Sequence, residues 1–158
     1  MKTLDEYDAV ISTPFGGLGI KLQDSKLNEV EFIYHPVQET VNSTYAKSIA
    51  TQFKEYFLDP RRSFDCKLEI QGTEFQQRVW ESLRKIPLGQ VRTYGDLAKE
   101  LNSSARAVGN ACRRNPVPLV VPCHRVVAKN GLGGFAGFTA GQTVNAKQWL
   151  LNFEAKYS

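Results

Sequence analysis

The chain has 158 residues, 42% of them hydrophobic and 23% charged, and a net charge of +4. This composition is that of a soluble globular protein long enough to bury a core without disulfide or metal support. No apolar segment approaches the roughly 20 residues of a membrane helix, and the polar first residues do not resemble a secretory signal. We therefore expect a cytoplasmic protein that does not associate with a membrane.

Cysteine and histidine content limits the metal and redox chemistry. Cys66, Cys112 and Cys123 are odd in number and lack close pair spacing, which argues against a disulfide framework and a zinc knuckle and favours a reducing compartment. Two histidines are too few for a multi-histidine site. We expect neither a metal nor a cofactor, and interpret Cys66 and Cys112 as small buried hydrophobic residues.

The pattern of residues 1–71 predicts a small α+β unit. Strand-like runs separated by turn residues are typical of an antiparallel meander. These runs cover residues 7–13, 18–22 and 27–34, and a further strand is expected at 64–70. Apolar residues recur every four positions over 45–57, between Asn42-Ser43 and Asp59-Pro60, which predicts one amphipathic helix.

Residues 72–158 predict a second, mostly helical unit. Its first helix is expected behind Thr73, with an apolar stripe that belongs to the core. The stripe consists of Phe75, Val79, Trp80 and Leu83. Thr93 and Asp96 then resemble a capping box that starts a short helix, and a tight polar turn leads to a second short helix at 105–112. Two such helices predict a helix-turn-helix.

Positive charge gathers in this second unit. Residues 84–129 carry a net charge of +7, whereas residues 1–83 carry −4. The basic segment is either a solvated face or a footprint for a polyanion. The second helix is expected to expose the mostly small residues Ala107, Gly109, Asn110 and Ala111. Small residues favour close contact with weak sequence specificity, as in a DNA minor groove, and Arg106 alone extends from the helix start.

Cys123 follows a strand-like apolar run at 115–121 and lies between Pro122 and His124. Because an imidazole base and the cationic Arg125 are adjacent, we expect an exposed thiol with a lowered pKa. A Cys-His pair is a weak signal by itself, and many such pairs are inert.

Six ordered motifs within residues 72–155 carry a family resemblance. They occupy 72–80, 86–89, 93–98, 105–109, 115–116 and 122–127. Together they resemble the alkylguanine-DNA alkyltransferases, also called methylated-DNA-protein-cysteine methyltransferases, and the amino-terminal unit is loosely similar. The resemblance implies an α+β fold, with a ribonuclease H-like amino-terminal sheet and helix followed by a winged-helix-like domain.

The activity implied by the resemblance is direct-reversal DNA repair. Cys123 would take the alkyl group, chiefly methyl, from 6-O-alkylguanine in a flipped-out base, with 4-O-methylthymine as a further substrate. Each molecule would act once, as a monomer on double-stranded DNA, and cooperative loading is left open. The alternative is a non-catalytic relative that binds alkylated bases and flags them for other repair pathways. A helix-turn-helix regulator and a cysteine hydrolase fit less well, because base-reading side chains and an oxyanion loop are not evident.

The resemblance also assigns the catalytic residues. His124 would take the thiol proton through a water, Glu154 would orient the imidazole, and Asn115 would hold the turn that carries Cys123. Arg125 is interpreted as structural. Tyr94 would help the damaged nucleotide rotate out and then donate to the flipped guanine.

The predicted DNA and base contacts complete the site. Arg106 would fill the gap left by the flipped nucleotide. The predicted DNA-binding residues are Tyr94, Ala105, Arg106, Ala107, Gly109, Asn110 and Arg113. The predicted base pocket consists of Val126, Phe135 and Ala136. Two residues near it differ from the family pattern, since Phe135 replaces a tyrosine and Phe138 replaces a glycine. The size of that pocket is therefore left open.

Overall fold

The computed structural model describes residues 4–133 and 142–158. It divides into two compact units, Met1–Ile70 and Gln71–Ser158. None of the helices in the described part of the chain has both the length and the apolar character needed to cross a membrane.

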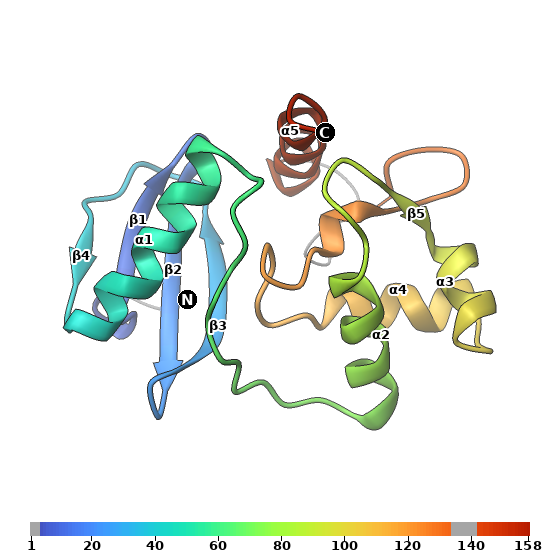
Figure 1. Ribbon diagram of the computed structural model, residues 1–158, viewed down its shortest axis with the longest axis horizontal. Helices are drawn as coiled ribbons and strands as arrows, with labels where there is room; N and C mark the ends of the chain where they lie inside the picture. Colours follow the sequence, from blue (N-terminus) through green and yellow to red (C-terminus); the bar gives the residue numbers. More distant parts are fainter. Residues whose placement is uncertain (1–3, 134–141) are drawn as a thin grey trace. The chain divides into compact units, whose positions relative to one another are not determined.

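The first unit is a four-stranded antiparallel sheet with α1 packed on it (Figure 1). Its elements are β1 (Ala9–Thr13), β2 (Gly16–Gln23), β3 (Lys26–Ile33), β4 (Thr40–Val41) and α1 (Thr44–Leu58), after a short 3-10 turn, η1 (Leu4–Glu6). The strand order is β3-β2-β1-β4, so that the predicted meander is confirmed and the short β4 is added at its edge. The predicted helix is also confirmed, with Ser43 as its N-cap and Asp59 as its C-cap.

The predicted strand at 64–70 was wrong. The segment forms only one isolated bridge, between Leu27 and Leu68. Its beginning is held by a side chain instead of by a neighbouring strand, because Gln52 of α1 accepts from the N–H of Asp65 at 2.7 Å and donates to the carbonyl of Asp65 at 2.9 Å. Because the bridge is parallel, a longer ladder along β3 would use the carbonyl of Glu69, and this carbonyl accepts instead from Nδ2 of Asn28 at 2.8 Å.

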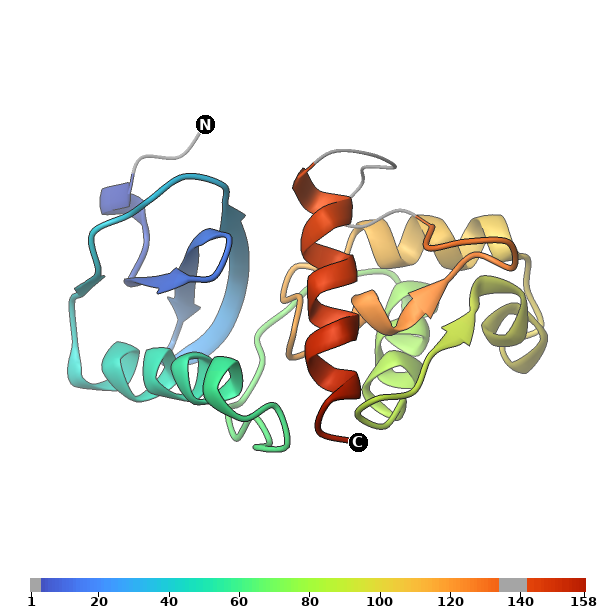
Figure 2. The ribbon, with the colours of Figure 1, turned by 90° about the horizontal axis from the view of Figure 1, so that it is seen from above.

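The second unit is mainly helical, with one short parallel strand pair. Its elements are α2 (Glu74–Arg84), β5 (Arg92–Thr93), α3 (Tyr94–Glu100), α4 (Ala105–Arg113), the 3-10 turn η2 (Cys123–Arg125), β6 (Val126–Val127) and α5 (Gln142–Ala155). α3 and α4 form the predicted helix-turn-helix. Figure 2 shows α5 running alongside the segment that carries η2 and β6, with which it is in contact.

Side-chain caps determine where these helices begin. Thr73 and Gln76 form a capping box at α2, and Thr93 and Asp96 form one at α3. Ser104 caps α4 by accepting from the third residue of that helix. Each cap satisfies backbone N–H groups that the first helical turn leaves without a partner. The helix starts are therefore encoded locally.

The core of the second unit takes buried residues from its four helices, from β6 and from the loop before η2. Its fully buried residues include Val79, Leu83, Leu97, Val108, Val117, Val126 and Leu150. Trp80 is also buried, and its indole N–H donates to the carbonyl of Ala111 at 2.8 Å, which joins α2 to α4. This packing fixes the helix-turn-helix against the loop that precedes Cys123.

Candidate active site

The run at 115–121, expected to be strand-like, is a loop. Within it Pro118 and Val121 form only an isolated bridge. Pro116 and Pro118 lack a backbone N–H, and Leu119 has a φ of 77°, in the left-handed region. Neither feature is compatible with a continuous strand.

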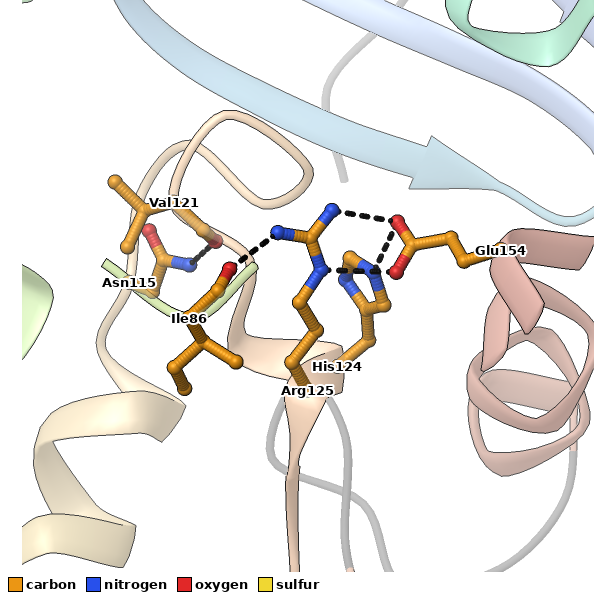
Figure 3. A network of polar contacts seen from close by, with 6 residues as sticks. All are labelled: Ile86, Asn115, Val121, His124, Arg125 and Glu154. Atoms are coloured by element: carbon orange, nitrogen blue, oxygen red, sulfur yellow. Dashed lines mark hydrogen bonds and ion pairs between the residues drawn. The ribbon is translucent and has the colours of Figure 1, made fainter. Parts of the chain in front are cut away.

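Asn115 closes this loop with its side-chain amide. Its Nδ2 donates to the carbonyl of Val121 at 2.8 Å, and its Oδ1 accepts from the N–H of Val117 at 3.0 Å. These two bonds tie both ends of the loop together, as the resemblance implied (Figure 3 shows the bond to Val121). Cys123 follows directly, and its own N–H donates to the carbonyl of Val121 at 2.8 Å.

The Cys123 thiol differs from the sequence-based expectation in two ways. Cys123 is only 6% exposed, so the prediction of an exposed thiol was wrong. Burial raises the pKa of Cys123, although a hydrogen bond with Asn115 and the positive charge of Lys147 oppose the rise. The expected lowering of the pKa was also wrong, because the guanidinium of Arg125 bonds to Glu154. The thiol is therefore held neutral at rest.

His124 and Glu154 form a buried pair. The Nε2 atom of His124 lies 2.8 Å from Oε2 of Glu154, and the two residues are 0% and 1% exposed (Figure 3). Burial lowers the pKa of His124 despite the neighbouring carboxylate, so the ring is neutral at pH 7. With Nε2–H assigned as the donor to Glu154, Nδ1 is the basic nitrogen. It makes no hydrogen bond to any residue that the structure describes.

Arg125 holds Glu154 from the other side. Its Nε donates to Oε1 at 2.8 Å and its Nη2 to Oε2 at 2.9 Å, while Nη1 donates to the carbonyl of Ile86 at 2.7 Å (Figure 3). Burial alone would raise the pKa of Glu154, but the bonds from His124 and Arg125 outweigh it and lower the pKa to about 2. These bonds fit the interpretation of Arg125 as structural, because it contacts the same carboxylate that bonds to His124.

Lys147 is a buried residue of α5 that the sequence analysis missed. It is 0% exposed, and its Nζ donates to the carbonyl of Val126 at 2.6 Å. A lysine at this depth is unusual. The signal that could have revealed it is its position seven residues before Glu154, which places both side chains on one helix face.

The predicted DNA-binding residues lie mainly on the exposed side of α4. Ala105, Arg106, Asn110 and Arg113 are exposed, and Ala107 and Gly109 are half-buried. Ala111 was wrongly expected to be exposed. It is 2% exposed because α2 packs over it and Trp80 bonds to its carbonyl.

Tyr94, the first residue of α3, lies between α4 and the end of the first described segment. A Cβ added at Gly109 would come 4.0 Å from its ring, and one at Gly133 would come 3.1 Å from it. Of the predicted base pocket, Val126 is fully buried. Phe135 and Ala136, together with Phe138, lie outside the described residues.

Comparisons with known proteins identify relatives over nearly the whole chain. The methylated-DNA–protein-cysteine methyltransferase of Methanosarcina acetivorans is 36% identical over 156 residues, which cover 94% of this chain and 97% of the relative. The constitutive methylated-DNA–protein-cysteine methyltransferase of Bacillus subtilis is 37% identical over 160 residues, which cover 94% of each chain.

Solved structures and a family model agree with these relatives. The crystal structure of the O6-methylguanine methyltransferase of Mycobacterium tuberculosis is similar with a TM-score of 0.79 and 33% identity, and the match covers 94% of this chain and 92% of that one. The Mycobacterium tuberculosis OGT in complex with DNA matches with a TM-score of 0.76 at the same identity and coverage. The family model described as 6-O-methylguanine DNA methyltransferase, DNA binding domain, matches residues 74–156. The chain therefore belongs to the 6-O-methylguanine DNA methyltransferase family.

Proposed function

We propose that this protein repairs alkylated DNA by direct reversal, transferring the alkyl group of 6-O-alkylguanine to Sγ of Cys123. The observation that carries the proposal is the buried contact between His124 and Glu154 at 2.8 Å, because His124 directly follows Cys123 in the chain. Membership of the family and the names of the relatives support it. Methyl is the chief group transferred, and 4-O-methylthymine is a further substrate.

The chemical step begins with loss of the thiol proton. Nδ1 of neutral His124 takes that proton through a water, and the Glu154 carboxylate stabilises the imidazolium that results. Sγ then forms a bond to the alkyl carbon while the bond from this carbon to the guanine O6 atom breaks. The electron pair stays on the guanine, which takes up a proton from water, while the proton of the thiol remains on His124.

Tyr94 is suited to donate to the flipped guanine. Burial raises the pKa of its hydroxyl, so the group stays protonated at neutral pH. The protein product is a thioether on Cys123. Because a thioether has no good leaving group, each molecule acts once.

DNA would be held by the exposed face of α4. Arg106 lies exposed at the start of this helix, inside the segment of net charge +7. We propose that α4 lies in the minor groove of double-stranded DNA, where Arg106 fills the space left by the flipped nucleotide. We also propose that the protein acts as a monomer in the cytoplasm.

The amount of lesion repaired distinguishes this function from binding alone. Duplex DNA carrying 6-O-methylguanine is incubated with increasing protein, and the bases are then quantified after digestion. Direct reversal predicts that guanine appears and that the moles repaired level off at the moles of protein. A non-catalytic binder would leave the 6-O-methylguanine unchanged, and a Cys123→Ser variant is the matched negative control.

A further inference from the structure

Lys147 is a fully buried lysine that the proposed mechanism does not use, and it bonds to the segment that carries the thiol. Its Nζ donates to the carbonyl of Val126, three residues after Cys123, at 2.6 Å. The same nitrogen lies 5.8 Å from the centre of the Tyr94 ring, over its face. Burial of an ammonium group is costly unless nearby groups stabilise the charge, so the surroundings of Lys147 indicate what the charge does.

The titratable groups that face Lys147 come from three elements. Tyr94 is on α3, Cys112 is on α4, and Cys123 and His124 are on η2. Burial lowers the pKa of Lys147 to about 8, although negative charge on either thiol opposes this shift. The positive charge of Lys147 is therefore opposed by burial and favoured by negative charge on the neighbouring thiols.

Cys112 and Cys123 differ in what else supports a negative charge. Burial and the neighbouring Cys123 raise the pKa of Cys112 to about 12, although the charge of Lys147 opposes the rise. At Cys123 a hydrogen bond with Asn115 adds to the charge of Lys147 in favouring the thiolate. The same ammonium group thus acts on two thiols, and among the described residues an amide donor assists Cys123 but not Cys112.

We propose that Lys147 is the electrostatic partner of the Cys123 thiolate. When the thiol proton leaves for Nδ1 of His124, a negative charge forms on a sulfur that water scarcely reaches, and the Lys147 ammonium stabilises it. Lys147 keeps its own proton throughout, and its bond to the Val126 carbonyl fixes the position of the charge. This role rests on the proposed function, because the thiolate is the attacking group in that reaction.

Three substitutions separate charge from structure. Lys147→Gln removes the charge and retains a donor for the Val126 carbonyl, Lys147→Met removes both, and Lys147→Arg retains both. The matched control is Lys156→Gln, which removes an exposed positive charge near the end of the chain. Folding is checked for each variant by circular dichroism and thermal unfolding.

The readout is the pH dependence of Cys123 alkylation by iodoacetamide, with peptide mapping to separate it from Cys66 and Cys112. This measurement needs no DNA. We expect Lys147→Gln and Lys147→Met to move the titration of Cys123 upward by at least one pH unit, so that alkylation at pH 7 slows about tenfold or more. Lys147→Arg should restore most of the loss, and Lys156→Gln should match the unmodified protein.

A wild-type pH profile in Lys147→Gln would overturn the proposal and leave Lys147 as a structural donor to Val126. If Lys147→Met does not fold, Lys147→Gln decides the question. If neither variant folds, Lys147→Arg decides it, because this variant keeps the charge. A shift of one pH unit or more in its profile of Cys123 alkylation would contradict a role for the charge. Failure of the proposed function gives a different result. In that case the iodoacetamide profile still shifts in Lys147→Gln, whereas unmodified protein takes no methyl group from DNA.

Discussion

Lys147 and Glu154 lie two turns apart on the same buried face of α5 and bond to the two ends of one short segment. Lys147 donates to the carbonyl of Val126, and Glu154 accepts from His124 and Arg125. One helix therefore holds both ends of the segment that follows Cys123, with a lysine at one end and a carboxylate at the other.

Removal of Arg125 should destabilise the fold strongly. The Arg125→Leu variant leaves Glu154 as a buried carboxylate with one partner fewer, and breaking a buried ion pair in this way costs about 3–5 kcal/mol. Urea unfolding followed by circular dichroism measures this loss. The control Arg62→Leu removes the exposed partner of Glu55 and should change stability by at most about 1 kcal/mol. Equal effects in the two variants would contradict the buried role of Arg125.

Stability in acid should depend on Glu154. Its folded pKa of about 2 lies below the ordinary value of 4.5, so the folded state binds fewer protons than the unfolded state between these values. The contribution of Glu154 is complete above about pH 4.5 and is lost as the pH falls toward 2. Unfolding free energies between pH 6 and pH 2 should therefore fall less steeply for Glu154→Gln than for the unmodified protein. Parallel curves would show that Glu154 is not held as a buried anion.

Loss of the Asn115 side chain should affect both stability and repair. Asn115→Ala leaves the Val117 N–H without its partner, at a cost of about 1–3 kcal/mol, and removes one of the two donors to the Val121 carbonyl, which keeps the bond from the N–H of Cys123. Thermal unfolding and the rate of methyl transfer from duplex DNA should both decline. Asn152→Ala, which removes an exposed hydrogen bond with Gln148, is the control and should leave both quantities near their original values.

Arg106 should matter for duplex DNA more than for a free base. If it occupies the space of the flipped nucleotide, Arg106→Ala slows repair of 6-O-methylguanine in duplex DNA far more than reaction with free 6-O-benzylguanine. Rates of adduct formation by mass spectrometry provide the comparison, with the exposed Arg84→Ala, on α2, as a charge-matched control. Equal losses with the two substrates would rule out a role for Arg106 in flipping.

Local signals made the helices predictable from the sequence. The caps at Thr73 and Thr93 act within four residues, and the apolar stripe of α2 repeats within two turns. The segment at 64–70 has strand-like residues, but its backbone is occupied by two side chains that are distant in sequence, Gln52 at Asp65 and Asn28 at Glu69. The strand prediction failed because nothing local encodes that competition.

The burial of Cys123 could not be predicted from its neighbours in the sequence. The adjacent His124 and Arg125 indicated an exposed, acidic thiol, yet both side chains face Glu154, thirty or so residues further along the chain. Glu154 itself was identified only through the family resemblance. Lys147 was missed because a lysine on a helix ordinarily lies at the surface, and only its spacing from Glu154 sets it apart.

Intact mass spectrometry after incubation with duplex DNA containing 6-O-methylguanine tests the central claim most directly. The account predicts that every active molecule gains a single methyl group, that peptide mapping places it on Cys123, and that excess DNA adds no second group. A methyl group on Cys66 or Cys112, an unmodified protein after the lesion has disappeared, or continued repair beyond one lesion per molecule would contradict it.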